Sequence, residues 1–167
     1  MDERVIGPYR EWRMSLRPGL QALAKAGAAA GGGDEPAARA ALAEALRYVD
    51  GLLLPASEAE EFTLFPTIDG VFGVTGACEP LKLQHEALRE MASDLRKVAA
   101  AAEKDGDTCA YGRYLQPLLF GLYGLARAHL ESEDAAFLPL LDAHLSESQV
   151  NVLVENSERI AAAKAAG

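Results

Sequence analysis

The chain has little of what several protein classes require. Its two cysteines have no metal-type spacing and are too few for a disulfide framework. No apolar run reaches the roughly 20 residues of a membrane span. The charged beginning also lacks the apolar segment of a signal peptide. The sequence therefore predicts a soluble, cytoplasmic protein that does not contact a membrane.

Positive charge is also scarce. Lys and Arg number 16 against 25 Asp and Glu, which gives a formal net charge of −9. Because such a surface repels polyanions, nucleic acid is not predicted as a partner, and neither is an anionic membrane. β-Branched runs are few, whereas alanine and leucine, which favour helix, are abundant. The length is sufficient for one domain with its own core, predicted over residues 1–167.

Apolar residues recur at intervals of three and four, the spacing that places them on one face of a helix. The segments with this pattern predict helices over residues 9–30, 35–65, 79–104, 107–142 and 146–163. Pro55 is expected to kink the second helix. Residues 66–77 contain several glycines and prolines and are predicted to form a loop. Four amphipathic helices with short connections predict an all-α fold, an antiparallel up-and-down four-helix bundle with a short C-terminal fifth helix.

One helical pattern occurs twice in the chain, with a single difference. His129 and Glu133 are one helical turn apart on an apolar face, so both side chains point the same way. In the stretch 56–66, Glu60 occupies the position equivalent to Glu133, but Ala56 occupies that of the histidine. The first and third helices align in the same manner. The chain is therefore interpreted as two related helix pairs, of which only the second has histidines.

The register of the helices predicts one polar layer inside the bundle. His85 lies about twenty residues before the turn between the last two long helices, and His129 about twenty after it, so both should lie at one height. Arg13 is opposite His85 in the internal alignment. The residues predicted to share this layer are Arg13, Glu60, His85, His129 and Glu133.

Such a layer requires compensating positive charge, because one buried carboxylate without a partner costs several kcal/mol. Two histidines and two carboxylates from three helices are a donor set that metal sites in bundle cores use. The candidate metal ligands are His85, His129, Glu133 and Glu60. Three further residues, Arg13, Arg89 and Glu61, are expected to surround them, with Arg89 paired with Glu60 or Glu133 or exposed to solvent. A bundle without metal, held by Arg13–Glu60 and His–Glu pairs, is the alternative.

Over most of residues 9–150 the chain resembles the hemerythrin-like family, also known as the HHE cation-binding domain. The resemblance rests on the run Gln84-His85-Glu86, the spacing of His129 and Glu133, and the acidic pairs that precede Leu64-Phe65-Pro66 and Phe137-Leu138-Pro139. It implies a four-helix bundle that holds two irons bridged by two carboxylates. Those carboxylates would be Glu60 and Glu133, with His85 and His129 on the second iron.

The departures from this family are as informative as the matches. The family's histidines on the first two helices would fall on Arg13 and Ala56, neither of which can replace an imidazole ligand. A further histidine of the oxygen-carrying members would fall on Arg89. We therefore predict a single ion, iron or alternatively zinc, with the Arg13 guanidinium in place of the other ion. Reversible oxygen carriage is not expected.

The sequence leaves three functions open. The first is a binding or sensing module for a small gas, peroxide or redox signal. The second is a non-haem iron enzyme that activates oxygen on a small molecule, since two histidines and a carboxylate are a common set for that chemistry. Ala56, small where the family has a histidine, would leave room for a substrate. The third is a metal-free bundle that retains only the fold.

Overall fold

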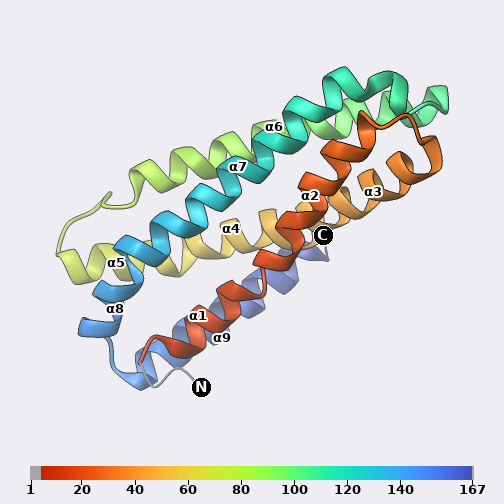
Figure 1. Ribbon diagram of the computed structural model, residues 1–167. Helices are drawn as coiled ribbons and strands as arrows, with labels where there is room; N and C mark the ends of the chain where they lie inside the picture. Colours follow the sequence, from red (N-terminus) through yellow and green to blue (C-terminus); the bar gives the residue numbers. More distant parts are fainter. Residues whose placement is uncertain (1–4, 167) are drawn as a thin grey trace.

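The computed structural model describes residues 5–166, in which all regular structure is helical (Figure 1). The first two rods of the bundle are α1 (Gly7–Met14) with α2 (Arg17–Ala30), and α3 (Glu35–Tyr48) with the π-helical turn η1 (Val49–Leu53), α4 (Leu54–Phe62) and α5 (Leu64–Phe72). The other two are α6 (Glu79–Asp105), and the 3-10 turn η2 (Cys109–Tyr111) with α7 (Gly112–Ala136) and α8 (Leu138–His144). A fifth helix, α9 (Glu147–Ala165), follows. The predicted all-α bundle with a C-terminal helix is confirmed.

Helix α9 corresponds to the short fifth helix predicted over residues 146–163 and packs against the bundle along its length. It has 19 residues and packs against α4 and α1 (Figure 1). Its first turn is closed by a capping box, in which Ser146 and Gln149 exchange side-chain and backbone hydrogen bonds. Helix α9 thus covers one side of both α1 and α4.

Prolines explain where the rods are interrupted. Pro18 and Pro139 lie in the first turns of α2 and α8, where a helix has no use for the missing amide hydrogen. The kink predicted at Pro55 takes the form of a π turn, because the amide of Leu54 bonds to the carbonyl of Val49. The wider turn accommodates the proline ring, which clashes with the preceding turn of a regular α-helix.

The predicted loop over 66–77 is wrong in its first part. Helix α5 continues to Phe72, and only residues 73–78 connect it to α6. Pro66 falls in the first turn of α5, where proline is tolerated. The helix ends at Gly73, whose φ of 68° is a left-handed conformation that glycine adopts without steric cost.

Two apolar clusters fill the bundle, and a polar layer separates them. The larger cluster joins α2, α3, α4, α6 and α7, and the smaller joins α1, α5, the first turn of α6, α8 and α9. In the first rod, Leu16 belongs to the larger cluster and Tyr9 to the smaller, with Arg13 between them. The other rods follow the same order. The side chains of this layer are all 3% exposed or less: Arg13, Glu60, His85, His129 and Glu133.

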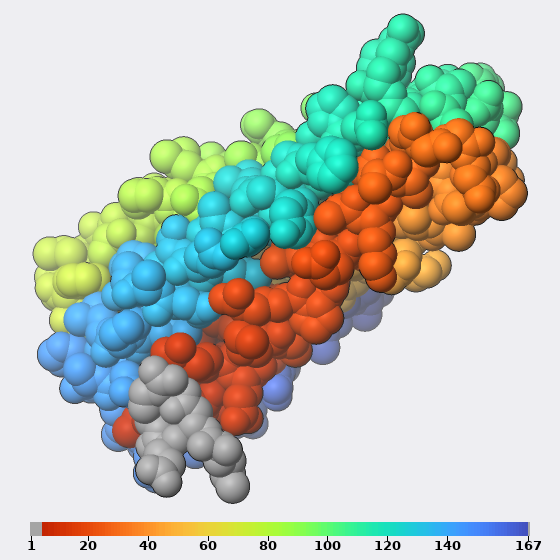
Figure 2. All heavy atoms as spheres, in the orientation of Figure 1, coloured from red at the N-terminus to blue at the C-terminus, as the bar shows by residue number. Residues whose placement is uncertain are grey.

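The rods are closely packed along their length. Figure 2 shows α2 and α7 in direct contact along one face of the molecule. At the first residue of α7, a Cβ added to Gly112 would lie 2.3 Å from the carbonyl oxygen of Ala30, so α2 passes close to α7 there. The polar layer is therefore held between well-packed apolar regions.

Cys78 precedes α6 and Cys109 precedes α7, so the two thiols lie at opposite ends of the bundle. Both are free, as the predicted topology required. Within residues 5–166, no helix combines the length and the apolar character needed to cross a bilayer.

Candidate metal centre

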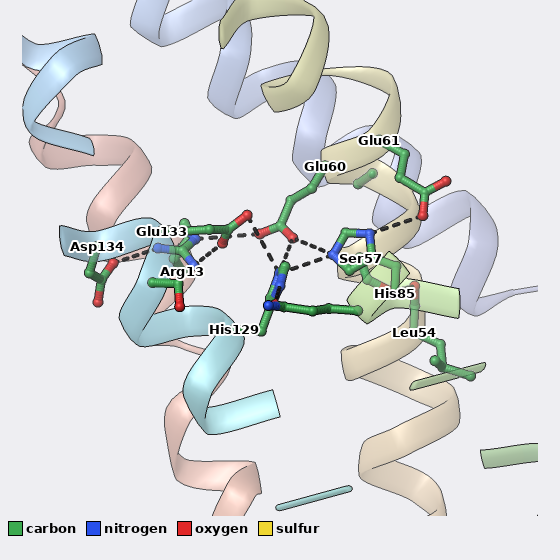
Figure 3. Close-up of polar contacts among 12 residues, drawn as sticks. Arg13, Leu54, Ser57, Glu60, Glu61, His85, His129, Glu133 and Asp134 are labelled. Carbon is green, nitrogen blue, oxygen red and sulfur yellow. Dashed lines mark hydrogen bonds and ion pairs between the residues drawn. The ribbon is translucent and has the colours of Figure 1, made fainter. Parts of the chain in front are cut away.

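The polar layer brings together the four residues predicted as metal ligands (Figure 3). Glu60 comes from α4, His85 from α6, and His129 and Glu133 from successive turns of α7. The Nε2 atoms of the two histidines are 3.0 Å apart. Each lies 3.4 Å from Oε2 of Glu60, and Oε1 of Glu133 is 3.5 Å from Nε2 of His129. Three potential donor atoms from three helices thus converge on one position, and Oε1 of Glu133 lies beside Nε2 of His129.

Hydrogen bonds on the outer side of each imidazole determine its tautomer. Nδ1 of His85 is 2.9 Å from Oε1 of Glu61, and Nδ1 of His129 is 2.9 Å from Oε1 of Gln84. Burial raises the pKa of Glu61, but hydrogen bonds from Arg89 and His85 outweigh it, so this pKa is lowered. An ionised carboxylate and an amide oxygen can only accept, and therefore both Nδ1 atoms donate.

Because Nδ1 donates in both rings, each imidazole in its neutral form directs the lone pair of its Nε2 atom at the other ring and at Glu60. Burial lowers the pKa of His129, which favours its neutral form. Three electron-pair donors this close repel one another unless a cation or a proton lies among them. Donor atoms that share one ion at about 2.1 Å are themselves roughly 3–3.5 Å apart. The residues present therefore fit a metal ion, and nitrogen with carboxylate oxygen suits iron and zinc.

Arg13 provides a fixed positive charge on the other side of the carboxylates. Its Nε is 3.4 Å from Oε1 of Glu60, while Nη2 donates to Oε2 of Glu133 and Nη1 to Oδ1 of Asp134. Asp134 is held from outside by Arg17 as well. Guanidinium is suited to this place because it stays charged and has five N–H donors in one plane. One buried arginine thus contacts three carboxylates (Figure 3).

Burial and neighbouring charge act differently on the two carboxylates. Burial alone raises the pKa of Glu60, but His129 and His85, whenever a proton lies on their Nε2 atoms, and the charge of Arg13 hold it well below its usual range. Burial raises the pKa of Glu133, and the charge of Glu60 raises it further against the opposing effect of Arg13. Oε1 of Glu133 is buried and has no hydrogen-bond partner in the described part of the chain. This oxygen is the atom whose electron pairs a cation would satisfy.

The sequence left two places open for Arg89, a pairing with Glu60 or Glu133 or exposure to solvent. Arg89 is 35% exposed, and its Nη1 donates to Glu61 at 2.8 Å. Glu61 then connects this surface arginine to His85, so it orients a candidate ligand without facing the centre itself. Ala56 is buried in the larger apolar cluster.

Sequence reasoning missed the contacts of Asp134 and Gln84. The internal repeat contained the signal for the first, because Asp134 is equivalent to Glu61 and Arg13 is equivalent to His85. Glu61 holds His85, and Asp134 holds Arg13 in the matching way. The sequence singles out Gln84 only as a neighbour of His85. Its contact with His129 on α7 cannot be predicted from helical periodicity.

Tyr9 is a further residue whose position near the centre was not anticipated. It is fully buried one turn before Arg13, and the side chain of Ser157 of α9 lies near its hydroxyl. Its pKa is raised well above the usual value, first by burial and then by the charge of Glu60. On an apolar stripe a buried tyrosine cannot be distinguished in advance from ordinary packing.

The model of the hemerythrin HHE cation-binding domain matches residues 15–141. This chain belongs to the hemerythrin family. All four candidate ligands of this hemerythrin-family chain lie within the match, whereas Arg13, with the rest of α1, and α9 lie outside it. Searches of curated proteins and of solved structures found no match.

Proposed function

We propose that this hemerythrin-family protein binds one iron ion in its bundle core and uses it to bind or sense a small gas or redox species. The observation that carries the proposal is the convergence of Nε2 of His85, Nε2 of His129 and Oε2 of Glu60 within hydrogen-bonding distance. Oε1 of Glu133, which has no other partner, is the fourth donor. Zinc is the alternative ion, because the same donor set suits both.

The division of the carboxylate oxygens supports a single ion. Oε1 of Glu60 and Oε2 of Glu133 contact Arg13, whereas the other oxygen of each faces the histidines. The two carboxylates thus link a permanent cation on one side to the candidate metal position on the other. A second ion on the Arg13 side would meet a guanidinium and no imidazole.

A bound ion would supply Lewis acidity and, in the case of iron, one-electron redox chemistry. The protein residues have the supporting roles. Glu61 and Gln84 hold the imidazoles in the productive tautomer, and Arg13 limits the repulsion between the carboxylates. The apolar clusters on both sides keep water from the layer.

An oxygen-activating enzyme is the second candidate, favoured by the set of two histidines and a carboxylate. It would require a substrate position beside Ala56, which is 2% exposed. A metal-free bundle is the third candidate. In that case Arg13 would be the only permanent cation in the layer, and protons would separate the histidines.

Metal analysis of protein from iron-supplemented cells tests these alternatives. We expect no more than one tightly bound ion per chain and its loss in His129→Ala. His144→Ala is the matched control, because His144 ends α8 outside the polar layer. Two ions at full occupancy would contradict the single site, and no ion in the presence of iron and zinc would favour the metal-free bundle.

Exposure of the iron(II) protein to nitric oxide and oxygen then separates sensor from enzyme. A sensor should show a stoichiometric change of the iron absorption that reverses when the gas is removed. Sustained oxygen consumption with an added small molecule would favour the enzyme. If the iron-loaded protein showed neither of these responses, the result would contradict gas binding.

A further inference from the structure

A shallow groove runs between α9 and the junction of α4 with α5. It has a volume of about 710 Å³, and its walls include Phe62, Thr63 and Pro66 on one side and Val152, Arg159 and Ile160 on the other. Phe62 is 65% exposed and Val152 56%. Two large apolar side chains on the surface of one groove are a feature of binding sites, because their burial stabilises a complex.

The charge of the groove differs from that of the rest of the protein. Among residues 5–166, Arg159 is the only charged residue that lines it, and no acidic residue does, although the chain has 25 acidic residues. The Arg159 guanidinium donates to the side-chain oxygen of Asn156 at 3.2 Å and forms no ion pair with any residue in 5–166. The groove therefore offers an apolar surface with one positive charge that forms no ion pair among residues 5–166.

A second groove, between α3 and α6, provides a comparison for the unpaired arginine. Its volume is about 330 Å³, and it has two arginines, Arg39 and Arg96. Each already has an acidic partner, since Arg39 pairs with Glu35 and Arg96 with Asp50. Its positive charges are satisfied within the protein, whereas the charge of Arg159 is not.

We propose that the α9 groove binds a medium-chain aliphatic carboxylate, with the chain against Phe62 and Val152 and the carboxylate on Arg159. Its volume lies within the roughly 300–1,000 Å³ range of small-molecule sites. The planar guanidinium matches a carboxylate with two parallel hydrogen bonds. A second copy of the chain is a poorer occupant, because two molecules with a net charge of −9 repel each other.

The groove belongs to this chain's own extension of the family domain, because α9 lies outside the matched residues. It is nevertheless joined to the polar layer through α4. Thr63 lines the groove, bonds to Ser157 of α9 at 2.8 Å, and donates its amide hydrogen to the carbonyl of Glu60 at 3.3 Å. The binding proposed here does not require a metal ion.

Calorimetric titration of the chelator-treated, full-length protein with decanoate below its micelle concentration tests the inference. We expect one site per chain and an affinity at least ten-fold weaker in Arg159→Gln. Val152→Glu should abolish binding by placing a negative charge in the groove. Arg127→Gln is the control, because Arg127 is an exposed arginine of α7 far from α9 in sequence. Decylammonium, with the same chain and the opposite charge, should not bind.

All three substitutions are at exposed positions, and each variant should retain the wild-type melting temperature. No binding of decanoate by the wild type would overturn the proposal, as would equal affinity for decanoate and decanol. An undiminished affinity in Arg159→Gln would place the ligand elsewhere. A dimer in analytical ultracentrifugation that Val152→Glu converts to monomer would show that a second copy occupies the groove.

Discussion

The two halves of the bundle provide positive charge for the same two carboxylates in different ways. The half formed by α1 to α5 contributes Arg13, a permanent cation fixed by three acidic partners. The half formed by α6 to α8 contributes His85 and His129, which present lone pairs and require a cation from outside. A repeated structure can therefore present the same pair of carboxylates in a half without nitrogen ligands, because Arg13 supplies the positive charge there.

The similarity between the halves extends to the residues that orient these groups. In the first half Glu61 lies next to Glu60 and reaches across to His85. In the second half Asp134 lies next to Glu133 and reaches across to Arg13. In each acidic pair, one carboxylate lies in the polar layer. The next carboxylate contacts the arginine or the histidine of the other half.

Removal of the permanent cation should have the largest effect. Arg13→Ala would leave Glu60 and Glu133 buried without it, at a cost of about 3–5 kcal/mol in the free energy of unfolding, measured with urea. Arg17→Ala is the matched control, since Arg17 is 35% exposed and contacts only Asp134 of this group. The control should cost less than about 1 kcal/mol. Equal costs for the two variants would mean that the first half does not depend on its fixed charge.

Histidines at positions 13 and 56 should give the first half the same imidazole ligands as the second half. The double variant Arg13→His with Ala56→His is expected to bind a second metal ion, which metal analysis per folded chain would reveal. Either substitution alone should leave the count at no more than one, because one imidazole with shared carboxylates is a poor site. If the double variant folds and its metal content is unchanged, the halves are not equivalent as described.

The orienting carboxylates offer a smaller and more selective change. Glu61→Ala removes the acceptor of His85 Nδ1 and should weaken metal binding about 10–100-fold, measured by competition with a chelator. Glu86→Ala is the control, because Glu86 is exposed and lies on α6 next to His85. Should the two variants bind metal equally well, the tautomer of His85 is not controlled by Glu61.

The smallest effect on the free energy of unfolding is expected at Glu35, where the two halves are in contact at a distance from the polar layer. Glu35 of α3 accepts a hydrogen bond from the Cys109 amide at 2.9 Å, just before α7. Backbone hydrogen bonds from Thr108 and Cys109 lower the pKa of Glu35 to about 2 from 4.5. Because the pKa is lowered on folding, the stabilisation is present above the ordinary pKa and disappears as the pH falls toward 2. The difference in unfolding free energy between wild type and Glu35→Gln should therefore shrink between pH 5 and about 2. A difference that does not vary with pH would show that the ionised form is not preferred.

The sequence predicted the polar layer because helical periodicity places residues at a definite height and on a definite face. Arg13, Glu60 and the two histidines could be found in this way before any coordinates. Contacts made by side chains beside that face could not. Gln84 and Asp134 reach sideways to another helix, and their partners depend on rotation and packing that periodicity does not specify.

The predicted loop over 66–77 was wrong for a related reason. Glycine and proline there were read by composition alone, although Pro66 is tolerated in the first turn of a helix. Leu64, Phe65 and Ile68 supply the apolar face of α5 and belong to the smaller cluster. Tertiary burial of that face outweighed the local composition.

The π turn at Val49–Leu53 has a consequence for how such a centre can change over time. A π turn contains one residue more than the α-helical turn it replaces, and one residue corresponds to about 100° of rotation around a helix. The phase of α4, and with it the direction of Glu60, is therefore set by the length of this turn and not by the sequence of α4. Gly51 lies within the turn, and an added Cβ there would meet no atom within 4 Å. A single deletion or insertion at this point would turn Glu60 into or out of the layer while every residue of α4 stayed the same.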